Sequence, residues 1–416
     1  MRIGIVGCGT AGPAAAIMLA RQGHAVTVFD KAPVLHPVGA GLLLQPSGLA
    51  VLESMGLRGS IERAGSVVRR MHATLPGGRT ILDLRYADLR SDLYGIGIGR
   101  GVLLNVLMGA ARAAGVEVQT GVEVTAFKPG AAAATLESRG KTLGTFDLVV
   151  IADGARSGLL PTLGIPVRVK QYRWGALWCI GCRPLDPSRP HADTLKQVYH
   201  STTTLIGVLP SGPLSDGTEA VSMFYSARTD RFDAVRLHGL DAWKQEVARL
   251  HPQAGEIAAQ VQSPDQLLPA AYREVVLPRW HGERFVILGD AGHALSPLLG
   301  MGANMGLVDA RALADAVERH GITGAPAAYS TARRPSIRAY QRMCRWMTPF
   351  FQSDVTPLAW ARDLTVHPLC RWGWSRRQAL NTIAGVKVGL FASGELPAPF
   401  LPRTDAEPIF AASAAE

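Results

Sequence analysis

The chain has 416 residues and a formal net charge of +10, with 47% hydrophobic and 18% charged residues. This length and apolar content can bury a large core and favour two interlaced domains. The sequence lacks a run of about eighteen uncharged apolar residues, and no charged segment precedes an apolar one at its start, which argues against a membrane span and a secretory signal. We therefore expect a cytoplasmic protein.

The first elements are a strand, a glycine-rich turn and a helix. Residues 2–6 form a short apolar run typical of a buried parallel strand, and they lead directly into Gly7, Gly9 and Gly12. In this pattern the first glycine permits a tight turn, the second lets the backbone approach phosphates, and the third lets the helix pack close to the strand. The pattern predicts a site for the pyrophosphate of a dinucleotide.

The second strand, residues 25–29, ends at Asp30. A carboxylate here can accept hydrogen bonds from ribose hydroxyls, which fits NAD or FAD and argues against a bound 2′-phosphate. The neighbouring Ala11 and Lys31 belong to the same predicted nucleotide site. A chance glycine-rich turn is the alternative, and the first motif alone leaves NAD and FAD open.

A second glycine cluster follows almost three hundred residues later. Residues 284–288 are typical of another buried strand, and Asp290 follows at the carboxyl end, where doubly wound sheets bind their ligands. An acid at this place can bind ribityl hydroxyls. Pro297 then stiffens a loop whose glycines let backbone N–H groups meet a flavin at a helix start. The predicted flavin contacts in this loop are Gly300, Gly302, Ala303 and Asn304, and a helix is expected over residues 304–316. An ordinary strand–loop–helix connection is the alternative.

With these motifs, residues 1–325 resemble the class A flavoprotein monooxygenases, typified by para-hydroxybenzoate hydroxylase and salicylate hydroxylase. A third fingerprint of that family, an Asp-Gly motif, is present at Asp153 and Gly154, and the order of the three motifs agrees. The resemblance implies FAD as cofactor and NAD(P)H as reductant. The chain departs from the family pattern at Gly292, where alanine is common, and at Met301, where glutamine is usual.

The resemblance also implies roles for individual residues. Asp153, Gly154 and Arg156 would contribute to FAD and NAD(P)H binding. The remaining implied FAD contacts are a helix with Arg100 and Leu104, a backbone contact from Val124 to the adenine, and the loop Gly39-Ala40-Gly41 near the isoalloxazine. Pro297 and the loop 300–304 would border the oxygen site.

We expect an α/β fold in which a Rossmann-like FAD-binding domain is interlaced with an antiparallel β-sheet substrate domain and followed by a C-terminal helical segment. Short β-rich runs bounded by Gly, Ser and Pro suggest the antiparallel sheet. The predicted boundaries are 1–70, 96–165 and 276–325 for the FAD-binding domain, 71–95 and 166–275 for the substrate domain, 326–395 for the C-terminal helices and 396–416 for a loosely ordered tail.

Cysteine and histidine patterns favour structural roles. Cys179 and Cys182 have redox or metal spacing, but they lie in a strand-like segment where the two thiols would point to opposite faces. The five cysteines fit a reducing compartment. The histidines lack paired metal spacing, and we expect His293 to support the turn beside Asp290. No metal site is predicted.

The segment 331–377 is basic, and its arginines face only two aspartates. The tryptophans interleaved with these arginines are Trp346, Trp360, Trp372 and Trp374. The first interpretation is a helical lid whose tryptophans pack over the substrate domain while the arginines stay in water. Peripheral contact with an anionic membrane is the alternative, and nucleic acid binding is not expected.

The reaction implied by the resemblance is hydroxylation of a small aromatic substrate. NAD(P)H would reduce FAD, and a flavin C4a-hydroperoxide formed with O2 would transfer one oxygen atom. Tyr225, on a strand position expected to face inward, and Gln45, beside the flavin loop, are the candidates for orienting the substrate. NAD(P)H would bind transiently across the same cleft, and the sequence carries no pattern that separates NADH from NADPH. We expect the protein to be a monomer or a homodimer.

Two alternatives keep both glycine clusters. One is an FAD-dependent reductase or dehydrogenase of an apolar substrate, which would not consume O2 in proportion to product. The other is a non-catalytic flavin-binding protein without NAD(P)H turnover. A flavin halogenase would be expected to show a Trp-x-Trp-x-Ile-Pro segment, which the sequence does not contain.

Overall fold

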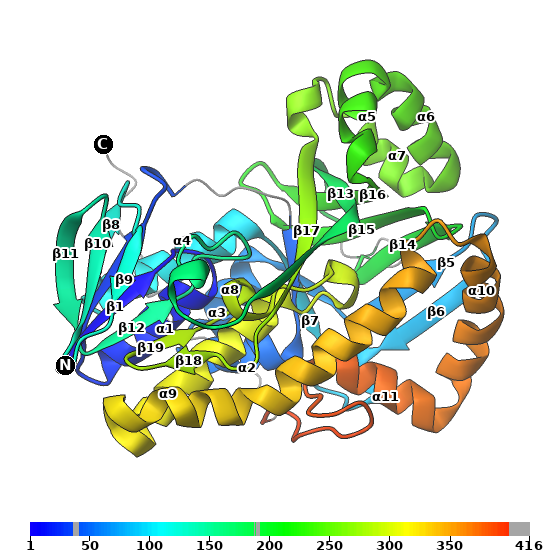
Figure 1. Ribbon diagram of the computed structural model, residues 1–416. Helices are drawn as coiled ribbons and strands as arrows, with labels where there is room; N and C mark the ends of the chain where they lie inside the picture. Colours follow the sequence, from blue (N-terminus) through cyan, green and yellow to red (C-terminus); the bar gives the residue numbers. More distant parts are fainter. Residues whose placement is uncertain (36–40, 187, 189–191, 399–416) are drawn as a thin grey trace.

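The computed structural model describes residues 1–35, 41–186, 188 and 192–398 (Figure 1). Most of the predicted tail lies outside the described residues, as do Gly39 and Ala40 of the predicted flavin loop.

A six-stranded sheet forms the core of the nucleotide half, with the strand order β18-β19-β12-β1-β2-β8. Its members are β1 (Arg2–Val6), β2 (Ala25–Asp30), β8 (Glu117–Thr120), β12 (Leu148–Ile151), β18 (His281–Gly282) and β19 (Phe285–Ile287). All neighbours pair in parallel except β18 with β19. The central strands β12 and β19 are buried along their whole length, as expected of a parallel sheet covered on both faces.

One face of this sheet is covered by helices and the other by a small antiparallel sheet (Figure 1). The helical layer holds α1 (Ala11–Arg21), α4 (Arg100–Ala113) and the first part of α9 (Gly302–Phe351). The small sheet consists of β9 (Ala126–Lys128), β10 (Ala134–Ser138) and β11 (Lys141–Phe146). Phe146 packs edge-on against Phe29 at 5.9 Å between ring centroids, which joins the two sheets through apolar contact.

The second half is built on a seven-stranded sheet with the order β17-β13-β16-β15-β14-β5-β6. Its members are β5 (Arg70–Thr74), β6 (Thr80–Arg85), β13 (Arg168–Pro184), β14 (Thr194–His200), β15 (Thr204–Pro213), β16 (Thr218–Arg228) and β17 (Leu268–Val276). Pairing is antiparallel apart from β14 with β5. These strands come from the two segments predicted for the substrate domain, although the domain boundaries themselves stay a prediction.

The two faces of the seven-stranded sheet meet different partners. One face carries a separate apolar cluster formed with α5 (Phe232–His238), α6 (Leu240–Leu250) and α7 (Pro252–Ala258), which stand above the sheet in Figure 1. The other face lies against the nucleotide half through a three-stranded sheet of β3 (Gly41–Leu44), β7 (Gly95–Gly99) and β4 (Ser66–Val68). The helices α2 (Pro46–Ser54) and α3 (Arg58–Ala64) join β3 to β4.

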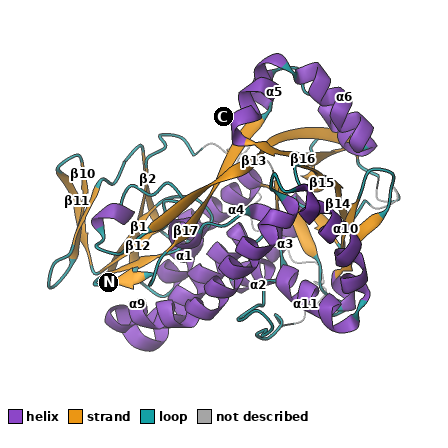
Figure 2. Cartoon of the chain, turned by 45° about the vertical axis from the view of Figure 1, so that its right-hand side comes forward, coloured by secondary structure: helices purple, strands orange, loops and turns teal. Residues whose placement is uncertain are grey.

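Short helical elements complete the connections. They are α8 (Asp290–His293) and the 3₁₀ turns η1 (Tyr86–Asp88), η2 (Leu160–Thr162), η3 (Thr229–Arg231), η4 (Pro264–Gln266) and η5 (Pro297–Leu299). The C-terminal part holds the rest of α9, then α10 (Thr356–Arg371) and α11 (Gly373–Ala384). The backbone of α9 breaks at Gly321, with φ 64°, and its second part runs from the parallel sheet to the seven-stranded sheet (Figures 1 and 2). The predicted α/β fold with two interlaced sheets and C-terminal helices is confirmed.

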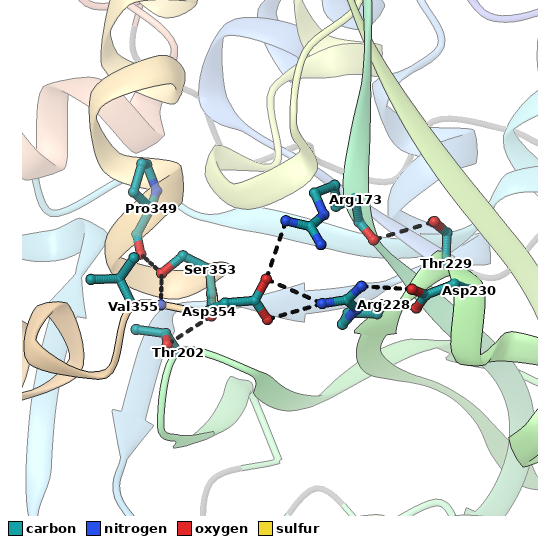
Figure 3. A network of polar contacts seen from close by, with 9 residues as sticks. All are labelled: Arg173, Thr202, Arg228, Thr229, Asp230, Pro349, Ser353, Asp354 and Val355. Carbon is teal, nitrogen blue, oxygen red and sulfur yellow. Dashed lines mark hydrogen bonds and ion pairs between the residues drawn. The ribbon is translucent and has the colours of Figure 1, made fainter.

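A polar network ties the end of α9 to the seven-stranded sheet (Figure 3). Arg228 donates to both carboxylate oxygens of Asp354 at 3.2 and 3.1 Å, and Arg173 approaches the same carboxylate at 3.4 Å. Thr202 and Ser353 exchange two further hydrogen bonds at 2.9 and 3.1 Å. These contacts fix where α10 begins.

The C-terminal helices differ from the predicted lid. The tryptophans at positions 346, 360, 372 and 374 expose 59%, 66%, 60% and 50% of their surface, whereas Arg333 and Arg362 are buried. The physical reason is that the buried guanidinium groups have partners: Arg333 donates to Asp309 at 2.6 Å, and Arg362 donates to the Ser201 carbonyl at 2.8 Å. The expectation that the tryptophans pack inward is therefore wrong, and the expectation that the arginines stay in water fails for Arg333 and Arg362 but holds for others, such as Arg371 and Arg377.

Candidate functional site

The carboxyl edge of the parallel sheet gathers the predicted nucleotide-binding residues. Of four neighbouring strands, β2 ends at Asp30, whereas β1, β12 and β19 end one to three residues before Gly7, Asp153 and Asp290, respectively. Because the strands run in parallel, these ends lie at one edge, where β2 and β19 are three strand spacings apart, about 14 Å. A single extended dinucleotide can cover that span.

The glycines of the first turn are required by their surroundings. Gly7 has φ +105°, and a β-carbon there would lie 2.4 Å from the Ala152 carbonyl oxygen. A β-carbon on Gly12 would lie 2.0 Å from the Gly7 carbonyl oxygen, so only glycine fits at this position in the first turn of α1. Gly9 differs, since nothing stands within 4 Å of its β-carbon position. Its backbone is open to a ligand beside the N-terminus of α1.

Asp30 is held at this turn by two backbone hydrogen bonds. The Cys8 N–H donates to Oδ2 at 2.7 Å and the Ala32 N–H donates to Oδ1 at 2.8 Å. Burial, and then the neighbouring Asp30 charge, raises the pKa of the Cys8 thiol to about 12, so the thiol stays neutral. Lys31 follows on the exposed surface.

The Asp-Gly motif forms the turn after β12. Gly154 has φ +84° and nothing within 4 Å of its β-carbon position. Among the described residues, the buried Oδ1 atom of Asp153 has no hydrogen-bond partner, and burial raises the pKa of this carboxyl. Arg156 lines a surface pocket of about 460 Å³, and Arg273 of β17 lines the same pocket. An unpaired buried carboxylate oxygen next to an open backbone turn indicates a ligand-binding position.

The late acidic turn rests on a buried ionic network. Asp309 of α9 accepts hydrogen bonds from the Gly289 N–H at 2.8 Å, from His293 Nε2 at 2.5 Å and from Arg333 Nε at 2.6 Å. Burial alone would raise the pKa of Asp309, but the charges of His293 and Arg333 outweigh burial and hold it well below its usual range. The network positions Gly289, with φ +60°, so that Asp290 is exposed at the start of α8. His293 thus supports the turn, as predicted.

The two glycine clusters are in direct contact. The β-carbon positions of Gly289 and Gly306 lie 3.2 and 3.3 Å from the Ala11 side chain. The β-carbon position of Gly302 lies 3.6 Å from Asp290 Oδ1, which places the acid beside the start of α9. Elements almost three hundred residues apart therefore form one continuous site.

Asn304 fixes the loop that leads into α9. Its amide nitrogen donates to the carbonyl oxygens of Leu43 and Gly300, each at 3.0 Å, and its Oδ1 accepts from the Gln45 N–H at 2.8 Å. The Asn304 side chain is thereby used within the protein. The first N–H groups of the helix, which include those of Gly302 and Ala303, have no intrahelical acceptor. Pro297 lies exposed at the start of η5, in the same loop.

Gln45 lies beside this loop with no exposed surface. Its Oε1 accepts a hydrogen bond from the Tyr86 hydroxyl, and its backbone precedes α2. Among the described residues, its Nε2 has no partner, and this atom lies 3.7 Å from the β-carbon position of Gly300. The structure brings Gln45 to the flavin loop, and Tyr86 is a partner that sequence reasoning missed.

The remaining predicted contacts have different surroundings. Gly41 donates its N–H to Ser222 Oγ at 2.7 Å, so it lies against the seven-stranded sheet. Arg100 is exposed at the N-terminus of α4 and Leu104 lies one turn further, half-buried. Val124 is buried in the core between β8 and β9. The assignment of these residues to FAD stays a prediction.

Tyr225 does not lie where the sequence suggested. Its hydroxyl donates to Glu246 at 3.1 Å and its ring contacts Trp243 edge-on, both on α6. It belongs to the apolar cluster under α5–α7, on the face of the seven-stranded sheet that points away from the nucleotide half. Because side chains alternate along a strand, its neighbours Ser222 and Phe224 hold the other face. The expectation that Tyr225 faces the nucleotide half is therefore wrong, and this placement does not support a role in orienting the substrate.

Aromatic side chains line that other face. The ring of Phe224 lies across Gly207 of β15 and 5.0 Å from the ring of Trp178, and Trp178 Nε1 donates to the Tyr272 hydroxyl at 3.2 Å. These three aromatic residues are half-buried, close to the Gly41–Ser222 contact. The alternation of side chains along β16, assigned to the correct faces, would have identified Phe224 from the sequence. The contact of Trp178 with Tyr272 depends on the pairing of β13 with β17, which the sequence does not show.

An FAD molecule fits these observations. The open positions at Gly9 and Gly154, the unpaired Asp153 oxygen, and the N-termini of α1 and of α9 beside Asp290 suit a ligand with phosphate and hydroxyl groups.

The comparison with known families agrees with this geometry. A family model described as an FAD binding domain matches residues 1–342. The chain belongs to this FAD-binding family. Its cofactor is therefore FAD, as the two glycine clusters and the Asp-Gly motif predicted.

Curated relatives match most of their length. A probable 2-heptyl-3-hydroxy-4(1H)-quinolone synthase of Rhodococcus erythropolis is 26% identical over 81% of this chain and 85% of its own length. A 3-amino-4-hydroxybenzoate 2-monooxygenase of Streptomyces cremeus is 26% identical over 87% of this chain and 91% of its own length. The predicted class, FAD-dependent monooxygenases of the aromatic hydroxylase type, is confirmed.

Solved structures share the fold. Klebsiella pneumoniae HpxO, complexed with FAD and uric acid, superposes with a TM-score of 0.76 at 20% identity, covering 92% of this chain and 97% of HpxO. PqsL of Pseudomonas aeruginosa, in complex with 2-aminobenzoylacetate, gives 0.71 at 24% identity, covering 85% of this chain and 97% of PqsL. Within the described part of this chain, no helix has the length and apolar character to cross a membrane.

Proposed function

We propose that this FAD-dependent monooxygenase uses NAD(P)H and O2 to hydroxylate a small aromatic substrate bound between the flavin loop and the aromatic face of the seven-stranded sheet. The observation that carries the proposal is the position of Trp178, Phe224 and Tyr272 next to the Gly41–Ser222 contact, opposite the nucleotide site. The named ligands of the relatives, a hydroxybenzoate, a quinolone and uric acid, share a planar ring.

The bound flavin supplies the oxygen-activating chemistry, and the protein supplies the surroundings. Half-buried aromatic rings exclude water and can stack on a planar substrate. Trp178 donates to the Tyr272 oxygen, which leaves the Tyr272 proton free to be donated to a substrate oxygen. Burial raises the pKa of Tyr272 to about 12, so this proton is retained at neutral pH.

The pocket lined by Arg156 and Arg273 supports transient binding of NAD(P)H. It adjoins the Asp153–Gly154 turn, and its two guanidinium groups match the phosphates of the reductant. The net charge of +10 favours the approach of an anionic cofactor.

The test is an oxygenation screen of the purified protein, which should be yellow. Phenols, aromatic acids and quinolones are tested for acceleration of NAD(P)H oxidation, and mass spectrometry searches for a product with one added oxygen. Acceleration with no oxygenated product from any compound would favour the reductase alternative. No NAD(P)H turnover with the whole panel would favour the flavin-binding protein.

We further propose that the C-terminal helices contact an anionic membrane surface. Five large apolar residues of this region are exposed over half or more of their surface: Trp360, Leu364, Trp372, Trp374 and Phe391. Rings 372, 374 and 391 form a contiguous group with centroid distances of 5.5 and 5.6 Å. Since Asp354 and Asp363 are both paired with arginines, the exposed Arg371 and Arg377 add a net positive charge, which suits acidic lipid headgroups.

Cosedimentation with vesicles tests this contact. We expect the protein to bind vesicles with about 30% phosphatidylserine and not vesicles of pure phosphatidylcholine. The double variant Trp372→Ser/Trp374→Ser should lose this binding. Equal vesicle binding by the wild type and the variant would count against the membrane contact. If neither binds vesicles and the variant changes its oligomeric state in gel filtration, the exposed aromatic residues belong to a subunit interface instead.

A further inference from the structure

Gln45 has a buried amide of which only one end is satisfied. The side chain has no exposed surface, and its Oε1 accepts the Tyr86 hydroxyl hydrogen bond. Among the described residues, no acceptor meets the two Nε2 protons. Buried polar groups are nearly always paired in folded proteins, so an unpaired amide at a binding site points to a partner supplied by the ligand.

The unpaired end points to the flavin loop. Nε2 lies 3.7 Å from the β-carbon position of Gly300, which has φ +62° and precedes α9. Asn304 holds this arrangement from both sides, because Oδ1 accepts from the Gln45 N–H at 2.8 Å and Nδ2 donates to the Gly300 carbonyl at 3.0 Å. The Gln45 backbone and the loop therefore move together, and the amide keeps its distance from whatever binds there.

Tyr86 determines which end of the amide faces the loop. It is fully buried in η1, and burial holds the pKa of its hydroxyl well above the usual range, so the hydroxyl remains a donor. The hydroxyl proton needs an acceptor, and beside the weak acceptor Met71 Sδ it has Gln45 Oε1, so the orientation with Oε1 towards Tyr86 and Nε2 towards Gly300 satisfies it. The hydroxyl is also 4.0 Å from Met71 Sδ, so Tyr86 lies among residues of the seven-stranded sheet. It acts through Gln45, as a positioning residue.

We propose that Gln45 donates a hydrogen bond to an acceptor on the flavin ring and that Tyr86 holds its amide in the donating orientation. The inference rests on the proposed function, since it requires FAD at the Gly300 loop. A donor aimed at the ring is stronger towards the reduced flavin, which carries more electron density, than towards the oxidised one. The pair therefore raises the midpoint potential of the bound flavin.

The experiment measures the flavin midpoint potential and the FAD dissociation constant of the holoprotein. Gln45→Leu should change the equilibrium between oxidised and two-electron-reduced flavin by about tenfold, a lowering of about 30 mV. It should also raise the FAD dissociation constant by about three- to tenfold. Gln45→Glu keeps the shape of the side chain and serves if the leucine variant does not fold. As its carboxyl ionises with rising pH, its potential should fall more steeply than that of the wild type.

Tyr86→Phe should lower the potential in the same direction by a smaller amount. In the Gln45→Leu background it should have no further effect, because Tyr86 acts only through the amide. The matched control is Tyr340→Phe, which removes an equally buried hydroxyl that donates to the Thr382 carbonyl at 2.9 Å. It should lower stability without moving the potential.

Two results would overturn the inference. One is an unchanged potential and FAD affinity in the Gln45 variants. The other is an equal effect of Tyr86→Phe with and without Gln45. A wild-type protein that binds no FAD would instead remove the proposed function, so the two failures can be told apart.

Discussion

Replacing Asp309 tests whether the buried network supports the flavin turn. Asp309→Ala removes the acceptor of three hydrogen bonds and leaves Arg333, which exposes only 6% of its surface, without its carboxylate partner. Removing one member of a buried ion pair costs about 3–5 kcal/mol, because the other charge stays buried and unpaired. We expect a loss of about 4 kcal/mol in the free energy of unfolding, together with weaker FAD binding as the Gly289 turn loosens.

The assay is urea unfolding followed by circular dichroism, with flavin fluorescence for FAD release. Asp315→Ala is the matched control on the same helix, since Asp315 pairs with Arg311 at 2.7 Å in a half-exposed i,i+4 pair. Such pairs contribute about 0.3–0.5 kcal/mol. Equal stability of the two variants, or full FAD retention by Asp309→Ala, would refute the reasoning.

Three further predictions concern the glycine turn, the substrate face and pH. Gly12→Ala should abolish FAD retention and destabilise the fold, because its β-carbon would lie 2.0 Å from a backbone oxygen. Gly9→Ala should fold normally and only weaken FAD binding. Fluorescence titration measures the FAD affinity of each variant, and thermal melting measures its stability. Tyr272→Phe should raise the substrate KM about fivefold. Tyr225→Phe should lower stability by about 1 kcal/mol and leave KM unchanged, and the reverse pattern would restore Tyr225 to the site. Because the pKa of Asp309 is depressed, the carboxylate stabilises the fold above about pH 4 and loses this effect as the pH falls. The difference in unfolding free energy between the wild type and Asp309→Asn should therefore narrow on acidification. A difference that stays constant with pH would contradict the depressed pKa.

The sequence by itself determined the nucleotide half. Each motif there is local: a strand, a glycine turn and the following helix carry their own steric reasons, as the positive φ of Gly7 and the contact of Gly12 with its own turn illustrate. The order of Gly7, Asp153 and Asp290 along the chain was sufficient to predict one ligand, because parallel strands bring their carboxyl ends to a common edge. The antiparallel character of the second sheet was also readable from its short β-rich runs.

Tertiary structure decided what local patterns could not. A shift of one residue along β16 exchanges Tyr225 for Phe224 on the face towards the nucleotide half, and only the cover of α5–α7 on the other face fixes the choice. The pairing of Gln45 with Tyr86 joins residues 41 positions apart through the docking of β3 and η1, for which the sequence carries no periodic signal. Arg333 and Arg362 are buried because the tertiary structure brings them to Asp309 and to the Ser201 carbonyl, 24 and 161 positions away, and hydrophobicity alone does not encode these partners.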